Sequence, residues 1–232
     1  MRRSEINAII RLADTFIQTC GFHLPPFAYW TPAEWAAKGP EAKEIVENRL
    51  GWDITDFGSG DYAKCGLFLF TVRNGHPDNW RTLKGKLYAE KLMIVEVGQV
   101  TPLHFHWKKM EDIINRSGGK LMMKLYNSLP DESLDLTADV KLSVDGVQRT
   151  FPAGGTLELA PGESVSLPPY CYHEFWGAES KVLVGEVSMV NDDAQDNRFY
   201  KPVGRFPTIE EDEAPLHLLV SDYDRVYGRA AQ

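Results

Sequence analysis

His104 and His106 stand two positions apart in the stretch GQVTPLHFHWKKMEDIINRSGG, and Glu111 follows five positions after His106. On a β-strand, side chains two positions apart leave the same face, about 7 Å apart along the chain. A turn between adjacent antiparallel strands would return Glu111 to that face. Imidazoles and carboxylates bind divalent metal ions, but paired histidines also occur on ordinary polar surfaces. This stretch alone leaves both interpretations open.

A second stretch, PGESVSLPPYCYHEFWG at residues 161–177, places His173 after a proline turn at the head of a predicted strand. Together the two stretches resemble the paired signature of the cupin superfamily. The first half of that signature is complete, with its required spacing met by Gly98, His104, His106, Glu111 and Gly118. In the second half, Gly162, Pro168 and His173 fit, whereas Tyr170 and Gly177 replace a glycine and an asparagine.

The cupin resemblance implies a double-stranded β-helix barrel, or jelly roll, with one divalent ion held by His104, His106, Glu111 and His173. Nitrogen and carboxylate ligands without thiolate suit Mn²⁺, Co²⁺, Fe²⁺, Ni²⁺ or Zn²⁺, and we expect Mn²⁺. Four protein ligands leave two positions open on an octahedral ion. Such an ion would chelate two neighbouring oxygens of a ligand and act on them as a Lewis acid.

The elements that must position these residues are mostly strands. Apolar residues at helical spacing predict a helix over residues 4–20, and Thr31 with Glu34 forms a capping box before a second helical piece, broken at Gly39-Pro40 and stopped at Gly51. VDGV at 144–147 predicts a tight hairpin. Predicted strands cover residues 66–72, 86–97, 101–106, 120–126, 139–144, 147–151, 155–159, 164–167, 173–176 and 181–189.

This pattern predicts an all-β fold with a helical N-terminal extension. We expect one domain over residues 1–232, with a helical cover at 1–60, the barrel at 65–190 and a C-terminal loop and tail at 191–232. The net charge of -8 disfavours nucleic acid and anionic membranes as partners, so we expect a small neutral or chelated ligand. Three dispersed cysteines without a C-x-x-C pair suit a reducing cytoplasm.

Beyond the cupin pattern, the chain from the first helix to about residue 213 resembles the bacterial D-lyxose isomerases. The stretches that carry the resemblance, besides the two above, are GFHLPPFA (21–28), LGWDITDFG (50–58), FTVRNG (70–75), YAEKLM (88–93) and GEVSMVNDDAQDNRF (185–199). The resemblance implies a cytoplasmic enzyme that interconverts D-lyxose with D-xylulose, and D-mannose with D-fructose. By analogy with other cupins we also expect a homodimer.

Aldose–ketose isomerisation by proton transfer needs a base at carbon, a proton shuttle between two oxygens and stabilisation of an enediolate. For the base we predict Glu186, a carboxylate within an apolar strand, whose pKa burial would raise; an outward-facing surface glutamate is the alternative. Lys109 and Lys91 are predicted donors to the oxyanion or to sugar hydroxyls, although lysines are usually solvated. Glu90 and Lys91 cannot both point into the barrel from a regular strand.

The acidic loop NDDAQDNRF at 191–199 is either a solvated turn or, as the resemblance suggests, a segment whose Asp193 or Asp196 and Arg198 close over the sugar. Two other functions remain open on the residues alone. An iron cupin dioxygenase would use the same ligands, and a non-catalytic sugar-binding cupin would keep the barrel without turnover. Within the isomerase hypothesis, a hydride shift remains the rival to proton transfer.

Overall fold

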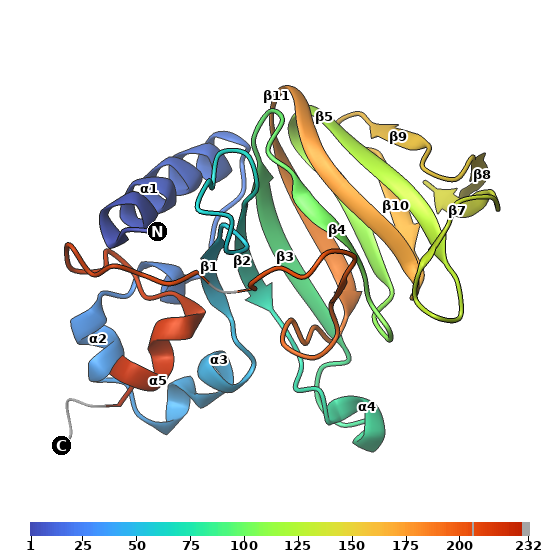
Figure 1. Ribbon diagram of the computed structural model, residues 1–232. Coiled ribbons are helices and arrows are strands. Elements are labelled where there is room, and N and C mark those ends of the chain that lie inside the picture. The colour runs from blue at the N-terminus through green and yellow to red at the C-terminus, as the bar shows by residue number, and fades with distance from the viewer. Residues whose placement is uncertain (206, 229–232) are drawn as a thin grey trace.

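Twelve strands form one antiparallel sheet in the computed structural model, which describes residues 1–205 and 207–228 (Figure 1). The main strand order is β1-β2-β3-β11-β5-β10-β7-β8. The strands are β1 Gly51–Thr55, β2 Leu67–Arg73, β3 Tyr88–Val95, β4 Thr101–Phe105, β5 Glu111–Ser128, β6 Leu134–Asp135, β7 Val140–Val144, β8 Val147–Phe151, β9 Thr156–Leu159, β10 Ser164–Leu167, β11 Cys171–Met189 and β12 Arg198–Phe199. The helices are α1 Arg3–Thr19, α2 Pro32–Ala36, α3 Lys43–Glu47, α4 Asn79–Thr82 and α5 Tyr223–Val226, with short 3₁₀ turns at Pro26–Tyr29, Pro40–Ala42 and Val220–Asp222.

The two longest strands, β5 and β11, curl into a barrel. Along this pair, Glu111 lies opposite Ser188, while His173 lies opposite Leu125. A straight strand would hold positions 173 and 188 roughly 50 Å apart. The side chains of Glu111 and His173 nevertheless approach to 3.2 Å, so the two strands must bend back over a common interior. The predicted all-β barrel with a helical N-terminal extension is thereby confirmed.

Glycines permit this bend. The pairing of β5 with β11 shifts register between Ala178 and Val182, opposite Gly118 and Gly119. Gly118 has a φ of 99°, which disfavours residues with a side chain, and a Cβ on Gly119 would overlap the carbonyl oxygens of Ala178 and Ser180. The backbones therefore approach closely only because both positions lack a side chain.

Strands β1 to β3 are buried on both faces. Their inner face, with Leu69 and Met93, joins the core of the barrel. Their outer face, with Phe70 and Leu92, packs against α1, which lies along this side of the sheet (Figure 1). The side of α1 that contacts them repeats at helical spacing, with Ile6, Ile10, Ala13 and Ile17. A sheet layer covered in this way gives near-continuous apolar runs rather than strict alternation.

Most predicted elements are present within a few residues. The helix over 4–20 is α1, the capping box of Thr31 and Glu34 begins α2, and Asp145 and Gly146 take the positive φ angles of the predicted tight hairpin. The predicted strands 173–176 and 181–189 are one strand, β11, and β5 begins at Glu111 rather than at residue 120. The bend at the paired glycines explains why the sequence suggested breaks there.

The predicted helical cover at 1–60 also contains a strand, β1, at the edge of the sheet. Gly51 begins this strand, and Arg49 takes the left-handed conformation after α3, so the prediction that Gly51 stops the helix was wrong. All five residues of β1 are buried, which removes the alternation by which strands are recognised.

The segment predicted as a C-terminal loop and tail is more structured than expected in its described part. It contributes β12 and α5, and Leu218, Val220 and Tyr223 pack against Trp35 of α2. Its Glu211 and Asp222 form ion pairs with the fully buried Arg3. The two ends of the chain are therefore joined through α1. The predicted tail also includes residues 206 and 229–232, which lie outside the described residues.

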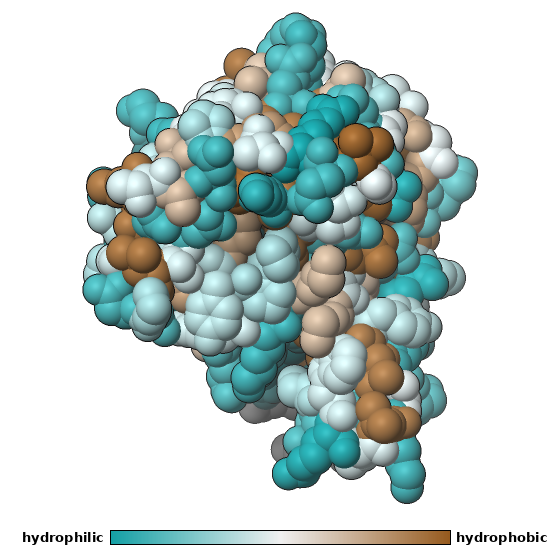
Figure 2. Space-filling model, turned by 90° about the vertical axis from the view of Figure 1, so that its right-hand side faces the viewer, coloured by the Kyte–Doolittle hydropathy of each residue, from teal (hydrophilic) through white to brown (hydrophobic). Residues whose placement is uncertain are grey.

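Figure 2 shows the side of the molecule near β7 and β8, where hydrophilic side chains cover most of the surface and apolar side chains appear in small separate groups. Leu136 and Val147 are among the exposed apolar residues of the chain. No helix within the described ranges is both long and apolar enough to cross a membrane.

We predict that Gly119→Ala lowers the free energy of unfolding by about 3 kcal/mol, because the new methyl group overlaps backbone atoms that cannot rotate away. Denaturant unfolding measures the change. Gly204→Ala is the matched control, since the nearest atoms to a Cβ there lie at 3.8 Å, and we expect a change within about 0.5 kcal/mol. Equal stability of the two variants would contradict a tight bend at Gly119.

Candidate functional site

Three buried histidines meet inside the barrel. His104 lies on β4, His106 follows that strand, and His173 lies on β11 directly opposite His104. One ring nitrogen from each of the three lies within 4.8 Å of the others. Burial, together with the neighbouring rings, holds the pKa of His104 well below its usual value, so its imidazole is neutral at neutral pH. Neutral imidazoles are the form that binds metal ions.

The tautomers of these histidines follow from their hydrogen bonds. Nδ1 of His104 lies 2.7 Å from the carbonyl oxygen of Pro102, Nδ1 of His173 lies 3.0 Å from that of Cys171, and Nδ1 of His106 contacts that of Asp196. Because a carbonyl oxygen only accepts, each neutral ring must carry its proton on Nδ1. The three Nε2 lone pairs are therefore free to bind an ion, and the carbonyls fix the orientation of the rings.

Glu111 completes this group. Its Oε1 lies 3.2 Å from Nε2 of His173 and 3.4 Å from Nε2 of His106, and it is a buried oxygen without a hydrogen-bond partner among the described residues. Burial alone would raise the pKa of Glu111, but the positive charge of Lys109 opposes it, and the pKa is held well below its usual value. An ionised carboxylate whose Oε1 has no hydrogen-bond partner within the described residues, and which faces imidazole lone pairs, fits a divalent cation.

The route by which Glu111 reaches this interior differs from the expected turn between adjacent strands. β4 and β5 do not pair with each other. Each of them pairs with β11 instead. Glu111 is the first residue of β5, and it returns to His173 because β5 and β11 bend. The four predicted metal ligands are thus brought together across the barrel rather than along one hairpin.

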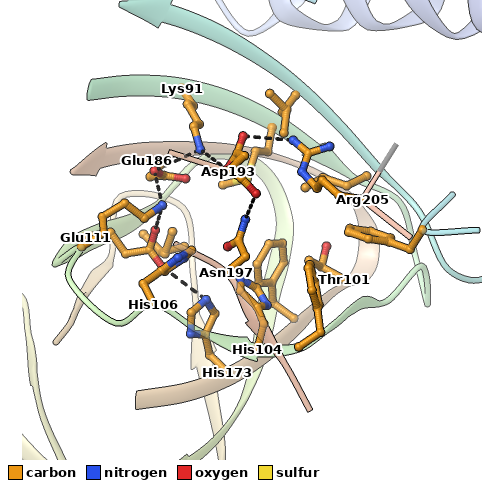
Figure 3. A pocket seen from close by; sticks show the side chains of 18 residues that line it. Lys91, Thr101, His104, His106, Glu111, His173, Glu186, Asp193, Asn197 and Arg205 are labelled. Atoms are coloured by element: carbon orange, nitrogen blue, oxygen red, sulfur yellow. Dashed lines mark hydrogen bonds and ion pairs between the residues drawn. The ribbon is translucent and has the colours of Figure 1, made fainter. Parts of the chain in front are cut away.

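Lys109, Lys91 and Glu186 form a buried group of charges beside the four residues above (Figure 3). Lys109 Nζ lies 2.7 Å from Glu111 Oε2 and 2.9 Å from Glu186 Oε1. Lys91, opposite Glu186 in the pairing of β3 with β11, lies 3.5 Å from the same oxygen. Of the two neighbours on β3, Lys91 is the one that points inward, while Glu90 pairs with Arg73.

Glu186 is buried as predicted, but the predicted rise of its pKa is wrong. Burial alone would raise the pKa, yet the positive charges of Lys109 and Lys91 outweigh it and hold the pKa below its usual value. All contacts of this carboxylate, including one from Ser188 Oγ at 2.9 Å, are made at Oε1. Within the described residues, Oε2 has no hydrogen-bond partner.

The charged group continues beyond Glu186. Asp193, which the sequence predicted as a sugar contact, lies 3.3 Å from Lys91 and 3.0 Å from Arg205. Arg205 in turn lies 2.7 Å from the buried Asp53 of β1. Burial alone would raise the pKa of Asp193, but Lys91 and Arg205 hold it well below its usual value. Positive and negative charges thus alternate from Glu111 to Asp53.

These charges line one part of a pocket, and apolar side chains line the rest. Figure 3 shows Lys91, Glu186, Asp193 and Arg205 along one side, and the histidines along another. The apolar lining consists of Phe57, Leu67, Leu69, Met93, Ile113, Phe175 and Phe199. Seven of the 18 lining residues are therefore apolar, and the others are polar groups that converge on one pocket, as in a small-molecule site.

Asp196 and Arg198 were also predicted as sugar contacts, but neither lines this pocket. The carboxylate of Asp196 accepts the backbone N–H groups of Trp107, Lys108 and Lys109 at 2.9, 3.0 and 3.0 Å. It therefore holds the turn that carries His106 and Lys109. Arg198 is directed to Glu132, with Nε at 2.9 Å from Oε2. These contacts give both residues partners within the protein, and their role as sugar contacts stays a prediction.

Four further residues shape the site and were not predicted. Arg205 and Thr101 line the pocket, Asn197 lines it and donates to the carbonyl oxygen of Asp193, and Asp53 pairs with Arg205. Asn197 lies between Asp196 and Arg198 in the sequence, so its place in the predicted loop could have indicated a role in the site. Asp53 and Arg205 are 152 positions apart, and nothing in the local sequence of either one indicates the other.

Comparisons with known proteins find relatives over nearly the whole chain. Residues 1–223 match the family model for D-lyxose isomerase. A D-lyxose/D-mannose isomerase of Serratia proteamaculans is 49% identical over 228 residues, covering 97% of this chain and 99% of that protein. A D-lyxose/D-mannose isomerase of Escherichia coli O157:H7 is 45% identical over 226 residues, covering 96% and 98%.

Among solved structures, two L-ribose isomerases share the fold. That of Cellulomonas parahominis superposes with a TM-score of 0.59 at 14% identity, covering 90% of this chain and 98% of that one. That of Geodermatophilus obscurus gives a TM-score of 0.60 at 15% identity, with the same coverage. At this identity the likeness concerns the arrangement of strands and helices only.

We predict that His173→Ala weakens the binding of a divalent ion at least about a hundredfold, because it removes one of four convergent ligand atoms. Metal content after dialysis against limiting Mn²⁺ measures the loss. His23→Ala is the matched control, since His23 is exposed and far in sequence from the cluster. Equal metal content in both variants would contradict a metal centre at these residues.

Proposed function

Since the chain belongs to the D-lyxose isomerase family, we propose that it is a metal-dependent aldose–ketose isomerase that interconverts D-lyxose and D-xylulose, and also D-mannose and D-fructose. The observation that supports this most directly is the contact of Lys109 with both Glu111 and Glu186. Through Lys109, the carboxylate of Glu111, which belongs to the proposed metal-binding group, lies next to the carboxylate of Glu186, whose Oε2 makes no hydrogen bond within the described residues. Isomerisation needs both features at two neighbouring carbons.

His104, His106, Glu111 and His173 would hold the ion, which we propose to be Mn²⁺. Bound there, a divalent ion would supply Lewis-acid stabilisation of two neighbouring sugar oxygens. The positive charge of Lys109 lowers the pKa of Glu111 well below its usual value, which keeps the carboxylate ionised. The carbonyl contacts of the three histidines keep Nε2 directed inward. The protein thus prepares the ligand set before any sugar enters.

Glu186 is the proposed base. Its lowered pKa means that it is ionised at neutral pH and ready to accept a proton, although a weaker base than an isolated glutamate. Lys109, Lys91 and Ser188 all contact Oε1, which orients the carboxylate and leaves Oε2 for the hydrogen at the carbon. Lys109, whose pKa is raised by its carboxylate neighbours in spite of burial, is the proposed donor to the oxygen on which negative charge develops.

The remaining polar lining would hold the rest of the sugar. We propose Lys91 and Asp193 as contacts to its hydroxyls, because both line the pocket and carry opposite charges. Asp196 is better explained as the residue that positions the turn at 106–110. A single domain, a cytoplasmic location and a homodimer stay predictions, as does proton transfer rather than hydride shift.

We predict that purified protein with Mn²⁺ and D-lyxose forms D-xylulose without oxygen or nicotinamide, and converts D-mannose to D-fructose under the same conditions. Chromatography of the sugars under nitrogen measures both. An absence of product over a panel of pentoses and hexoses would overturn the proposal. Oxygen consumption with iron would instead favour a cupin dioxygenase, and tight sugar binding without turnover would favour a binding protein.

Glu186→Gln should lower kcat by at least about a hundredfold, because the amide cannot accept the proton from carbon. Metal content should stay at the wild-type level, since Glu186 is not among the four ligands. Glu90→Gln is the matched control, because Glu90 lies on the neighbouring strand but pairs with Arg73. We expect its kcat to match the wild type. A Glu186→Gln variant with kcat within threefold of the wild type would exclude Glu186 as the base.

A further inference from the structure

One hydroxyl in the pocket has no partner. Thr101 begins β4, is 2% exposed and lines the pocket together with His104. Its Oγ1 is buried and makes no hydrogen bond within the described residues. A buried polar group is normally paired, because losing its contact with water costs free energy that only a new hydrogen bond offsets. Valine would fill the same space without that cost.

A β-bulge turns this hydroxyl inward. Along β11, His173 lies opposite His104 and Phe175 lies opposite Thr101, so three steps on β4 match two steps on β11. In a regular strand that directs His104 inward, Pro102 would share that face and Thr101 would point outward. The bulge reverses this order at position 101. Bulges of this kind redirect a side chain and occur often next to binding sites.

The place of Thr101 in the pocket separates it from the proposed chemistry. Figure 3 shows Thr101 away from Glu111 and Glu186, on the side of the pocket near Arg205 and His104. The two reacting carbons of a sugar must lie next to Glu186 and the metal ligands. The rest of the sugar chain would therefore extend toward Thr101 and His104. Phe199 lies beside His104 and contacts Phe57, so this part of the pocket has an apolar lining.

We infer that the hydroxyl of Thr101 hydrogen-bonds a sugar hydroxyl beyond the two reacting carbons and makes Thr101 a specificity-determining residue. The inference rests on the proposed function of the site. A threonine hydroxyl both donates and accepts, so it suits a sugar hydroxyl, which does the same. A site built to pair with a hydroxyl discriminates against ligands that lack it.

Steady-state kinetics with three variants test this role. Thr101→Val should lower kcat/KM for D-lyxose about tenfold, mainly through KM, because the lost contact is present in the ground state and the transition state alike. Thr101→Ser keeps the hydroxyl and should stay within about threefold of the wild type. Thr150→Val, on the exposed strand β8, is the control and should leave kcat/KM unchanged. Among the D-lyxose analogues deoxygenated at C3, C4 or C5, one lacks the contacted hydroxyl. With that analogue, wild type and Thr101→Val should have equal kcat/KM.

A second readout does not depend on turnover. The metal-free Thr101→Val protein should melt at an equal or higher temperature than the wild type, since an unpaired buried hydroxyl is removed. The stabilisation of the protein by the non-reacting pentitol D-arabinitol should be smaller in Thr101→Val than in the wild type.

An active wild type with kcat/KM of Thr101→Val within twofold would overturn the role of Thr101 and leave the proposed function standing. A wild type inactive on every sugar would overturn the proposed function instead. In that case the pentitol measurement decides alone, and an equal thermal shift in wild type and Thr101→Val overturns the role of Thr101.

Discussion

The pairing of buried charges is the constraint on which the site depends. Lys109 lies between Glu111 and Glu186, and it can be buried as a cation only because both carboxylates are there. The same requirement continues through Lys91, Asp193 and Arg205 to Asp53. Each charge between the two ends of this series contacts two opposite charges, so displacement of one member removes an ion-pair partner from each of its neighbours.

This constraint explains why two bent strands matter so much. β11 carries both His173 and Glu186, and β5 begins with Glu111. The bend at Gly118 and Gly119 brings the two ends of this strand pair over one interior, so that metal ligands and the proposed base share a pocket. The turn at 106–110, held by the carboxylate of Asp196, then inserts Lys109 between them.

The sequence was sufficient for the features that depend on local spacing or on a known motif. The convergence of the predicted metal ligands follows from His-x-His, Glu111 and His173, and most strands follow from apolar runs between turn residues. Strand β1 was not predicted because both of its faces are buried. The inward orientation of Thr101 was not predicted because a bulge breaks the alternation of side chains along β4. The direction of the pKa shift at Glu186 needed the positions of Lys109 and Lys91, and partners distant in sequence cannot be read from one chain.

The ion pairs of Arg205 also set an order of events during synthesis. Asp53 leaves the ribosome 152 residues before Arg205. Until then, Asp53 and Asp193 would be two neighbouring carboxylates without this cation, which opposes their burial. The nascent barrel can therefore settle around its pocket only after residue 205 has been translated, and a chain that ends before residue 205 would keep an open, charged interior.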